Sequence, residues 1–390
     1  MKSLWNFKAG NFICGLCIIY ACISIFSSNT ARAFGHTLQS SPLTSWQIMA
    51  NADTQSPGII NSVAAINTNE AWAVGNTLRN DLYDQTLFEH WNGKIWQVIP
   101  GATIPQTNPA THAVPMGVAE IATNNVWVVG RIFNIITGNQ PLIEHWNGTN
   151  WRLVPAARGT SQLQGISALA SNNIWALGSS GGGTDQSSSL PLVENWNGVA
   201  WSAIKTPINT STTQFSAIVA LSSNNVWIAG EQGNATLFEH WNGTDWSITP
   251  SPNITVSQGF STTYMNSIRA LTPDDIWSVG YVNNYSSSGS INIPLIEHWN
   301  GKTWKLIQSP AGNIVLSAVA GHTAHDVWAI GYQPGQTIFE HWNGKNWSLV
   351  AVPELQGATL NDLTIIPNSS GLLVGGGTFG TELPILADHF

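Results

Sequence analysis

The segment Phe-Glu-His-Trp-Asn-Gly-Lys-Ile-Trp at residues 88–96 recurs, with small changes, five more times along the 390-residue chain. The later copies occupy residues 143–151, 193–201, 238–246, 296–304 and 339–347. Copies of one segment spaced about 45–55 residues apart are typical of solenoids and propellers, in which each repeat forms one structural unit. One repeated architecture must therefore account for most of the molecule.

Each repeat predicts four β-strands, here called a, b, c and d in chain order. Strand a is a short apolar stretch such as residues 62–66, and strand b is a segment such as Asn-Asn-Val-Trp-Val-Val-Gly at residues 124–130. Strands c and d flank the Asn-Gly of the recurring segment. All four are rich in Val, Ile, Trp and Phe and are bounded by Gly, Asn and Pro, as strands are. Asn-Gly favours a two-residue type I′ turn, which would pair Trp91 with Lys94 and Glu89 with Trp96.

The two ends of the chain carry complementary parts of a repeat. Residues 362–390 supply strands a, b and c, and end in Asp-His-Phe where other repeats have Glu-His-Trp. Residues 45–49, Ser-Trp-Gln-Ile-Met, match a strand d. Pairing of these ends would protect the open sheet edges. We therefore predict an all-β, seven-bladed β-propeller over residues 43–390, with four antiparallel strands per blade and the last blade closed by the N-terminal strand.

The first 33 residues have the features of a secretory signal peptide. Lys2 and Lys8 precede an apolar run at residues 12–26, and Ala-Arg-Ala at 31–33 fits a cleavage site. The run is shorter than the roughly 20 residues that a membrane-spanning helix needs. We predict cleavage near Ala33, a linker at residues 34–42, and a mature protein that is secreted or held at the cell surface, with no membrane span.

The mature chain would be acidic and free of cysteine. All three cysteines lie at positions 14, 17 and 22, so no disulfide or thiolate ligand remains after cleavage. Loss of Lys2, Lys8 and Arg32 would take the formal net charge from −8 to −11. An acidic exported protein is a poor nucleic-acid binder. We therefore expect a monomer that binds a glycan or a protein, with no nucleic-acid partner.

The combination of Val-Trp-Val-Val-Gly with Glu-His-Trp-Asn-Gly-x-x-Trp resembles the secreted bacterial β-propeller repeat proteins. These are grouped loosely with the kelch, galactose-oxidase-like and Asp-box (BNR) propellers, and the resemblance covers about residues 43–390. The Asp-box pattern Ser-x-Asp-x-Gly-x-Thr-Trp is met only in part at residues 297–304, where Glu297 and Trp299 replace Ser and Asp. Asp-box hairpins are structural in that family, so the resemblance implies a fold and no sialidase activity.

The recurring Glu-His pairs combine an acid with an imidazole, as at Glu89 and His90. Adjacent residues of a strand point to opposite faces, so the two side chains of a pair cannot share one site. We expect each buried carboxyl group to bond an indole or backbone N–H between blades. The tryptophans occupy repeat positions and should pack in the core, although those of strands c and d leave a role in sugar stacking open at the rim. We predict no catalytic residue, metal site or cofactor.

Binding residues are expected where the repeats differ. The b–c and d–a loops vary in length and share one face of the propeller, and loops on a rigid scaffold often bind ligands. Strand a should line a central channel with small side chains, a pattern that Arg269 and Asp362 interrupt as an ion pair or a small polar site. The candidate ligand-binding residues are Arg79, Tyr83, Arg131, Phe133, Tyr264, Arg269, Tyr281, Tyr285, Asp362 and Phe379.

These features favour an exported, non-catalytic binding propeller that recognises a glycan or a protein through the b–c/d–a face. The alternative is a secreted glycoside hydrolase or lyase with its site at the mouth of the channel. Galactose-oxidase chemistry is excluded because it needs a Tyr crosslinked to a Cys, and the mature chain would have no cysteine. A surface or matrix protein without a discrete ligand remains a third interpretation.

Overall fold

The computed structural model describes residues 47–49, 58–77, 85–104, 111–134, 138–181, 189–256, 259–287, 289–352, 358–377 and 385–388. The chain divides into two units, Met1–Thr37 and Leu38–Phe390, and every described residue belongs to the second. The expected signal peptide and linker, residues 1–33 and 34–42, lie outside the described residues. Both stay predictions.

Five antiparallel sheets of four strands each form the middle of the second unit. The first comprises β6 (Thr111–Ala122), β7 (Asn125–Asn134), β8 (Gly138–Trp146) and β9 (Trp151–Leu153). The second comprises β10 (Thr160–Ala170), β11 (Asn173–Ser180), β12 (Leu190–Trp196) and β13 (Trp201–Ile204). The third comprises β14 (Thr213–Ser222), β15 (Asn225–Gln232), β16 (Ala235–Trp241) and β17 (Trp246–Thr249). The strand order within each sheet is the predicted a-b-c-d.

The fourth and fifth sheets repeat this order. The fourth comprises β18 (Phe260–Thr272), β19 (Asp275–Ser286), β20 (Gly289–Trp299) and β21 (Trp304–Leu306). The fifth comprises β22 (Val315–Thr323), β23 (Asp326–Gln333), β24 (Gln336–Trp342) and β25 (Trp347–Leu349). Strands a, b and c of the fourth sheet are the longest of their kind in the described part of the chain, so this sheet extends furthest along the b–c end.

The sixth sheet joins the two ends of the chain and has eight strands. Its N-terminal members are β1 (Gln47–Met49), β2 (Gly58–Asn67), β3 (Glu70–Thr77), β4 (Gln85–Trp91) and β5 (Trp96–Val98). Its C-terminal members are β26 (Thr359–Ile365), β27 (Leu372–Gly377) and β28 (Ile385–Asp388). The predicted closure by the N-terminal strand is confirmed, because β1 pairs antiparallel with β28 and places Ile48 opposite Leu386.

The predicted number of seven blades is wrong, since the described strands form six hydrogen-bonded sheets and so six blades. The first and last groups of strands merge because Ile59 of β2 pairs with Gly377 of β27. Glycine at residue 377 favours this approach, because a Cβ atom there would lie 3.0 Å from the Ile59 Cα, which is closer than ordinary contact. Two backbones can therefore meet at this junction.

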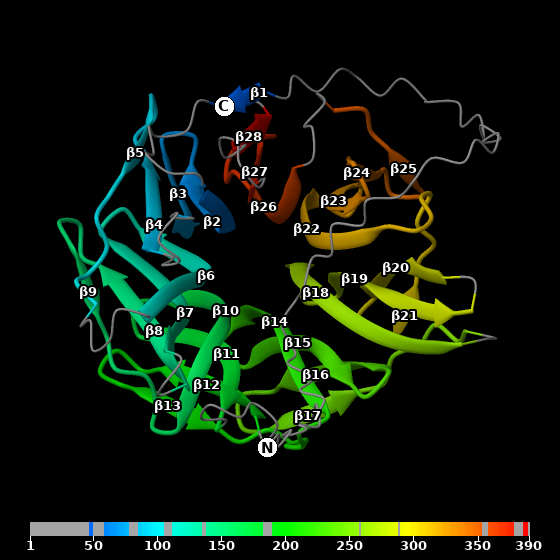
Figure 1. The fold of residues 1–390 in the computed structure, drawn as a ribbon, viewed down its shortest axis with the longest axis horizontal. Coiled ribbons are helices and arrows are strands. Elements are labelled where there is room, and N and C mark those ends of the chain that lie inside the picture. Colours follow the sequence, from blue (N-terminus) through cyan, green and yellow to red (C-terminus); the bar gives the residue numbers. More distant parts are fainter. Residues whose placement is uncertain are drawn as a thin grey trace, which may run out of the picture. The chain divides into compact units, whose positions relative to one another are not determined.

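The a strands lie nearest the axis around which the sheets follow one another (Figure 1). Each contacts the a strand before and after it, and the last contacts the first, which makes a closed cycle. The members of this inner cycle are β2, β6, β10, β14, β18, β22 and β26. The eight-stranded sheet contributes two of them, β2 and β26.

Tryptophans join each sheet to the next. Trp277 of strand b packs against His298 of its own sheet, with ring centroids 4.1 Å apart. The same indole meets Trp342 and Trp347 of the following sheet at 5.2 and 5.4 Å, the second contact edge-on. Trp277 and Trp347 are nearly inaccessible to solvent. The tilted and edge-on geometry is that preferred by aromatic rings, so the predicted core role of the tryptophans is confirmed.

The loop between strands c and d differs from the predicted two-residue turn. Trp91 pairs with Trp96 and Glu89 with Val98, so four residues form the loop. The Asn92 side chain accepts hydrogen bonds from the backbone N–H groups of residues 94 and 95, both at 3.1 Å. This local competition by an Asx side chain stabilises the wider loop. The register differs by an even number of residues, so Glu89, Trp91 and Trp96 still share one face, as predicted.

A β-bulge interrupts every strand of the inner cycle, opposite the glycine that ends the strand-b motif. In the fifth sheet the register shifts between Leu316 and Ala318, and Leu316 pairs with Gly331. The bulge brings the Val315 carbonyl oxygen so close that a Cβ atom on residue 331 would lie 2.1 Å from it. Only glycine accepts such an approach. Equivalent conflicts occur at Gly75, Gly130, Gly178, Gly230, Gly280 and Gly376.

The acid and imidazole of each Glu-His pair serve separate contacts. His298 donates to the Asp275 carboxylate at 2.8 Å, and that carboxylate also accepts the Trp277 indole N–H at 2.9 Å. Glu144 is fully buried and accepts from the backbone N–H of Ala102, 2.7 Å away in the preceding d–a loop. The predicted structural role of these pairs is confirmed for the residues named.

Burial raises the pKa of several strand-c glutamates. The pKa of Glu144 rises to about 7, against a weaker lowering by the Ala102 N–H, and that of Glu239 rises to about 8. The pKa of Glu297 also rises to about 8. These carboxyl groups hold protons in the folded protein at pH values where the unfolded chain has released them. These groups therefore lower the free energy of unfolding as pH rises from about 4.5 to 8.

Replacing Gly331 by Ala should lower the free energy of unfolding by at least about 2 kcal/mol, because the new Cβ atom overlaps a backbone carbonyl that cannot move without breaking the bulge. Urea unfolding of the Gly331→Ala variant would measure this loss. Gly312→Ala is the matched control, since no atom lies within 4 Å of the place that its new methyl group would occupy. Equal stability of the two variants would contradict the role given to the motif glycine.

Stability should fall as pH rises from about 4.5 to 8, because the unfolded state has lost protons that the buried glutamates keep. One such group contributes a slope of about 1.4 kcal/mol per pH unit inside its window. Glu239→Gln removes one titrating group while keeping the shape of the side chain. Urea unfolding between pH 4.5 and 8.5 should show a shallower decline for this variant. The exposed Asp245→Asn change in the same sheet should leave the decline as it is.

Candidate functional site

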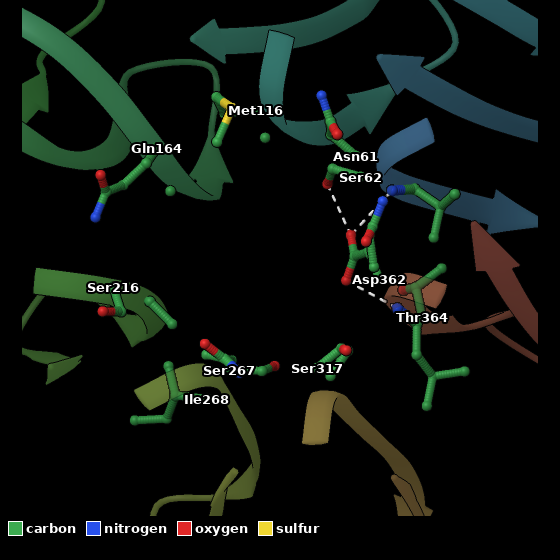
Figure 2. A pocket seen from close by; sticks show the side chains of 18 of the residues that line it. Asn61, Ser62, Met116, Gln164, Ser216, Ser267, Ile268, Ser317, Asp362 and Thr364 are labelled. Carbon is green, nitrogen blue, oxygen red and sulfur yellow. Dashed lines mark hydrogen bonds between the residues drawn. The ribbon is translucent and has the colours of Figure 1, made fainter. Parts of the chain in front are cut away.

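The bulges of the inner strands turn one residue per strand toward the central channel. These residues fall between the register shifts of strand a and so have no partner in the ladder; they are Asn61, Met116, Gln164, Ser216, Asn266, Ser317 and Asn361. Together with their neighbours they line a cavity of about 190 Å³. Figure 2 shows Asn61, Gln164, Ser216 and Ser317 arranged around this cavity.

Side-chain amides in this ring form hydrogen bonds from an inner strand to the next inner strand of the cycle, at every second strand along the chain. Asn61 donates to the Pro115 carbonyl at 2.7 Å, and Asn266 donates to the Leu316 carbonyl at 2.7 Å. Asn361 donates to the Ile60 carbonyl at 2.8 Å, across the junction between the last and first inner strands. Gln164 makes the corresponding bond to the Phe215 carbonyl. Each amide nitrogen is thus engaged in a hydrogen bond to the neighbouring inner strand.

Arg269 and Asp362 line the same cavity. Arg269 donates to the Thr364 hydroxyl at 2.9 Å, while the Asp362 carboxylate accepts from the Ser62 hydroxyl at 2.7 Å and the Val63 N–H at 2.9 Å. Although the channel leaves both side chains partly accessible, burial is the larger influence on each. Burial lowers the pKa of Arg269 and raises that of Asp362, and the opposite charge of the other residue opposes both shifts.

The mouth of the channel is formed where strand b continues past its glycine. The residues that directly follow the motif glycine vary; they are Asn76, Arg131, Ser179, Glu231, Tyr281, Tyr332 and, after Gly376, Gly377. Each pairs with a residue of strand a, as Glu231 does with Gln214 and Tyr281 with Tyr264. Directly paired residues present their side chains on one face, so these variable positions form matched pairs around the mouth.

Two further cavities open at this mouth and continue into the channel. One, of about 300 Å³, is lined by Tyr281 and Tyr332 and shares Asn266, Ser317 and Asn361 with the central cavity. The other, of about 450 Å³, lies between the second, third and fourth sheets and shares Gln164 with the central cavity. Both belong to the b–c/d–a face.

Glu231 is the buried acid of the 450 Å³ cavity. Its Oε2 accepts long hydrogen bonds from the Ser216 hydroxyl at 3.3 Å and the Met265 N–H at 3.4 Å. Burial raises the pKa of Glu231 to about 7, and these two donors oppose the rise. The group therefore changes charge near neutral pH.

The structure brings together four of the candidate binding residues. Arg269 and Asp362 share the central cavity, and Tyr264 stacks on Tyr281 at the mouth with centroids 4.8 Å apart. Arg131 lies at the position equivalent to Tyr281 on β7.

The remaining candidates lie elsewhere. Phe133 and Tyr285 lie further out on β7 and β19, with 37% and 51% of their surfaces exposed, and line none of the cavities described above. Arg79, Tyr83 and Phe379 are outside the described residues.

Sequence reasoning missed Glu231, Gln162 and Gln214. Charged and aromatic side chains of long loops were the expected binding residues, whereas these three residues lie inside strands. A usable signal was present, because the residue after each motif glycine varies while the glycine does not. The ring of bulged residues was also missed, since a bulge is not visible in a two-residue alternation.

Within the described ranges, no group of three or more His, Cys, Asp or Glu side chains is placed to hold a metal ion. The same part of the chain contains no helix with the length and apolar character that crossing a membrane requires.

Comparisons with known proteins identify the fold. No protein-family model matches the sequence, and no curated protein matches it. The structure is similar to YCF48 from Cyanidioschyzon merolae, with 16% sequence identity, 88% of this chain and 98% of that chain covered, and a TM-score of 0.57. It is also similar to YCF48 bound to D1 peptide, at 13% identity, 90% and 99% coverage and a TM-score of 0.56.

A third similar structure is a catalytically inactive virginiamycin B lyase from Staphylococcus aureus with Quinupristin. Here the identity is 12%, the coverage is 89% of this chain and 100% of that chain, and the TM-score is 0.58. Likeness at such low identity concerns the fold alone. The described residues form an all-β propeller of repeated four-stranded units.

Asp362→Ala should lower the free energy of unfolding by about 3 kcal/mol, because it leaves Arg269 without its neighbouring negative charge and removes the acceptor for the Ser62 and Val63 donors. The double variant Arg269→Ala, Asp362→Ala introduces the residue type that β22 has at the equivalent positions, Ala320 and Ala318. A double-mutant cycle measured by urea unfolding should give a coupling of at least about 1 kcal/mol. Strict additivity would show that the two charges do not interact.

Proposed function

We propose that this chain is an exported, non-catalytic binding protein that engages a glycan or a protein through the b–c/d–a face of the propeller. The mouth of the channel is the centre of that face. The N-terminal 33 residues support export because they have the charge, apolar run and cleavage site of a signal peptide.

One observation carries this proposal: the repeats agree where sheets pack and differ where the channel opens. The strand-b tryptophan and glycine recur, while the residue after the glycine is an amide, a cation, a hydroxyl, an acid or a phenol according to the sheet. A scaffold that needed only stability would tolerate one residue type at these equivalent places. Variation of side-chain chemistry around one concave mouth is what a specific ligand would require.

The similar structures support a binding role without identifying the ligand. One was solved with a bound D1 peptide and another is a lyase with Quinupristin. The same fold therefore serves binding in one protein and belongs to an enzyme in another, and the site must decide. In this chain the described mouth is composed mainly of amide, hydroxyl and phenol groups, which suits recognition.

The proposal predicts that the mouth, and not the opposite end of the propeller, binds ligand. The triple variant Arg131→Ser, Tyr281→Ser, Tyr332→Ser places at three mouth positions the residue that Ser179 already supplies in β11, so it should fold. The wild-type protein should bind at least one ligand on an array of neutral and anionic glycans or in a displayed peptide library. The triple variant should bind the same ligands at least tenfold more weakly.

The matched control changes the c–d loops at the other end of the strands. Lys94→Thr, Lys302→Thr, Lys345→Thr replaces three exposed lysines by the residue found at Thr149 and Thr244 in the same loops. Its binding should stay within twofold of wild type. If this control loses binding while the mouth variant keeps it, the ligand binds the opposite face and the proposal is wrong. A wild-type chain that binds no probe would also overturn the proposal.

A further inference from the structure

The 450 Å³ cavity at the mouth is lined by polar side chains from several strands. Gln162 comes from β10, Gln214 from β14, Glu231 from β15 and Tyr264 from β18, and hydroxyl groups of Thr212 and Thr262 complete the wall. Its volume lies within the range of about 300–1,000 Å³ typical of small-ligand sites. The cavity is therefore large enough for one or two sugar rings.

The side chains of this cavity have hydrogen-bonding capacity that the protein does not use. Glu231 is 7% exposed, and both of its hydrogen bonds fall on Oε2. No described residue donates to its Oε1. Gln162 accepts from the Asn139 amide at its Oε1, at 2.9 Å, and no described residue accepts from its Nε2. The cavity thus offers a carboxyl oxygen and an amide N–H₂ group to a ligand.

Gln214 stands directly across from Glu231 in the β14–β15 ladder. Since directly opposed residues share a face of the sheet, its amide group and the Glu231 carboxyl group border the same space. An acceptor beside an amide that both donates and accepts matches two adjacent hydroxyl groups, each of which donates one hydrogen bond and accepts another.

The apolar part of the wall comes from Leu190, Pro191, Phe215 and the ring of Tyr264. The Tyr264 ring is held by stacking on Tyr281, at an interplanar angle of 20°. Aromatic rings of this kind offer a rigid apolar surface next to a polar hydroxyl group. The described lining contains one carboxyl group and no cationic side chain, so it does not favour an anionic ligand.

We infer that this cavity is a binding subsite for a neutral carbohydrate, whose adjacent hydroxyl groups bond Glu231, Gln214 and Gln162 while an apolar face of the sugar ring lies against Tyr264. This inference deepens the proposed function and rests on it. A peptide ligand fits less well, because most of the lining side chains are amides and hydroxyls and only a few are apolar.

The test uses the full-length chain on an array of neutral oligosaccharides built from hexoses, deoxyhexoses and N-acetylhexosamines. Calorimetry with the strongest array ligand then gives affinities for the variants. Gln214→Ala together with Glu231→Gln should weaken binding at least tenfold, since the first removes an exposed amide and the second replaces the acceptor by a group of the same shape. Thermal unfolding of this variant would confirm that it is folded.

Gln232→Ala is the matched control. Gln232 is exposed, follows Glu231 directly and pairs with Thr213, so its side chain lies on the opposite face of β15. Its affinity should stay within twofold of wild type. If the Gln214/Glu231 double variant still binds the neutral sugar, the subsite is wrong and the proposed function stands. If the wild-type chain binds only anionic glycans or peptides, the subsite is also wrong. A wild-type chain that binds no class of ligand would overturn both proposals.

Discussion

The structure depends on the packing of strand-b tryptophans against two tryptophans of the next sheet, a contact printed along the chain for Trp72, Trp127, Trp175, Trp227 and Trp277. Trp328 instead lies in an apolar cluster with Leu360 and Leu363 of the last sheet. Trp227 meets Trp299 and Trp304 of the following sheet at 4.9 and 5.7 Å, and Trp72 meets Trp146 and Trp151 in the same way. The contact has a direction, because strand b of one sheet packs on strands c and d of the next. Identical units can therefore follow one another around an axis, each covering the apolar face of its neighbour.

The bulge in each inner strand separates the packing of the scaffold from the chemistry of the channel. Because a strand-a carbonyl is pushed toward strand b, the motif must have glycine there, as at Gly331. The bulged residue is released from the ladder and faces the channel instead. Side chains such as Asn61, Gln164 and Asn361 can then differ from those of other sheets without disturbing the tryptophan contacts. A uniform scaffold thus carries a varied channel.

The candidate site was predictable where one residue broke a repeated pattern. Arg269 and Asp362 stand at positions that other repeats fill with small residues, and they do share the central cavity. Tyr264 and Tyr281 were predicted as loop residues; they lie in β18 and β19 instead, and they stack at the mouth. Glu231 was not predicted, because its significance comes from the cavity that separate sheets form around it.

The sequence by itself determined the repeat, the order of four strands in each unit, the pairing of the chain ends and the structural role of the Glu-His pairs. These follow from local periodicity and from complementary half-repeats, which a single chain displays directly. Only the tertiary structure decided that the blades number six, because Ile59 and Gly377 meet across more than 300 residues of sequence. It also decided the four-residue c–d loop and the cavities at the channel mouth. The blade number and the cavities depend on the approach of distant backbones, about which strand periodicity carries no information. The wider loop depends on hydrogen bonds from nearby backbone N–H groups to the Asn92 side chain.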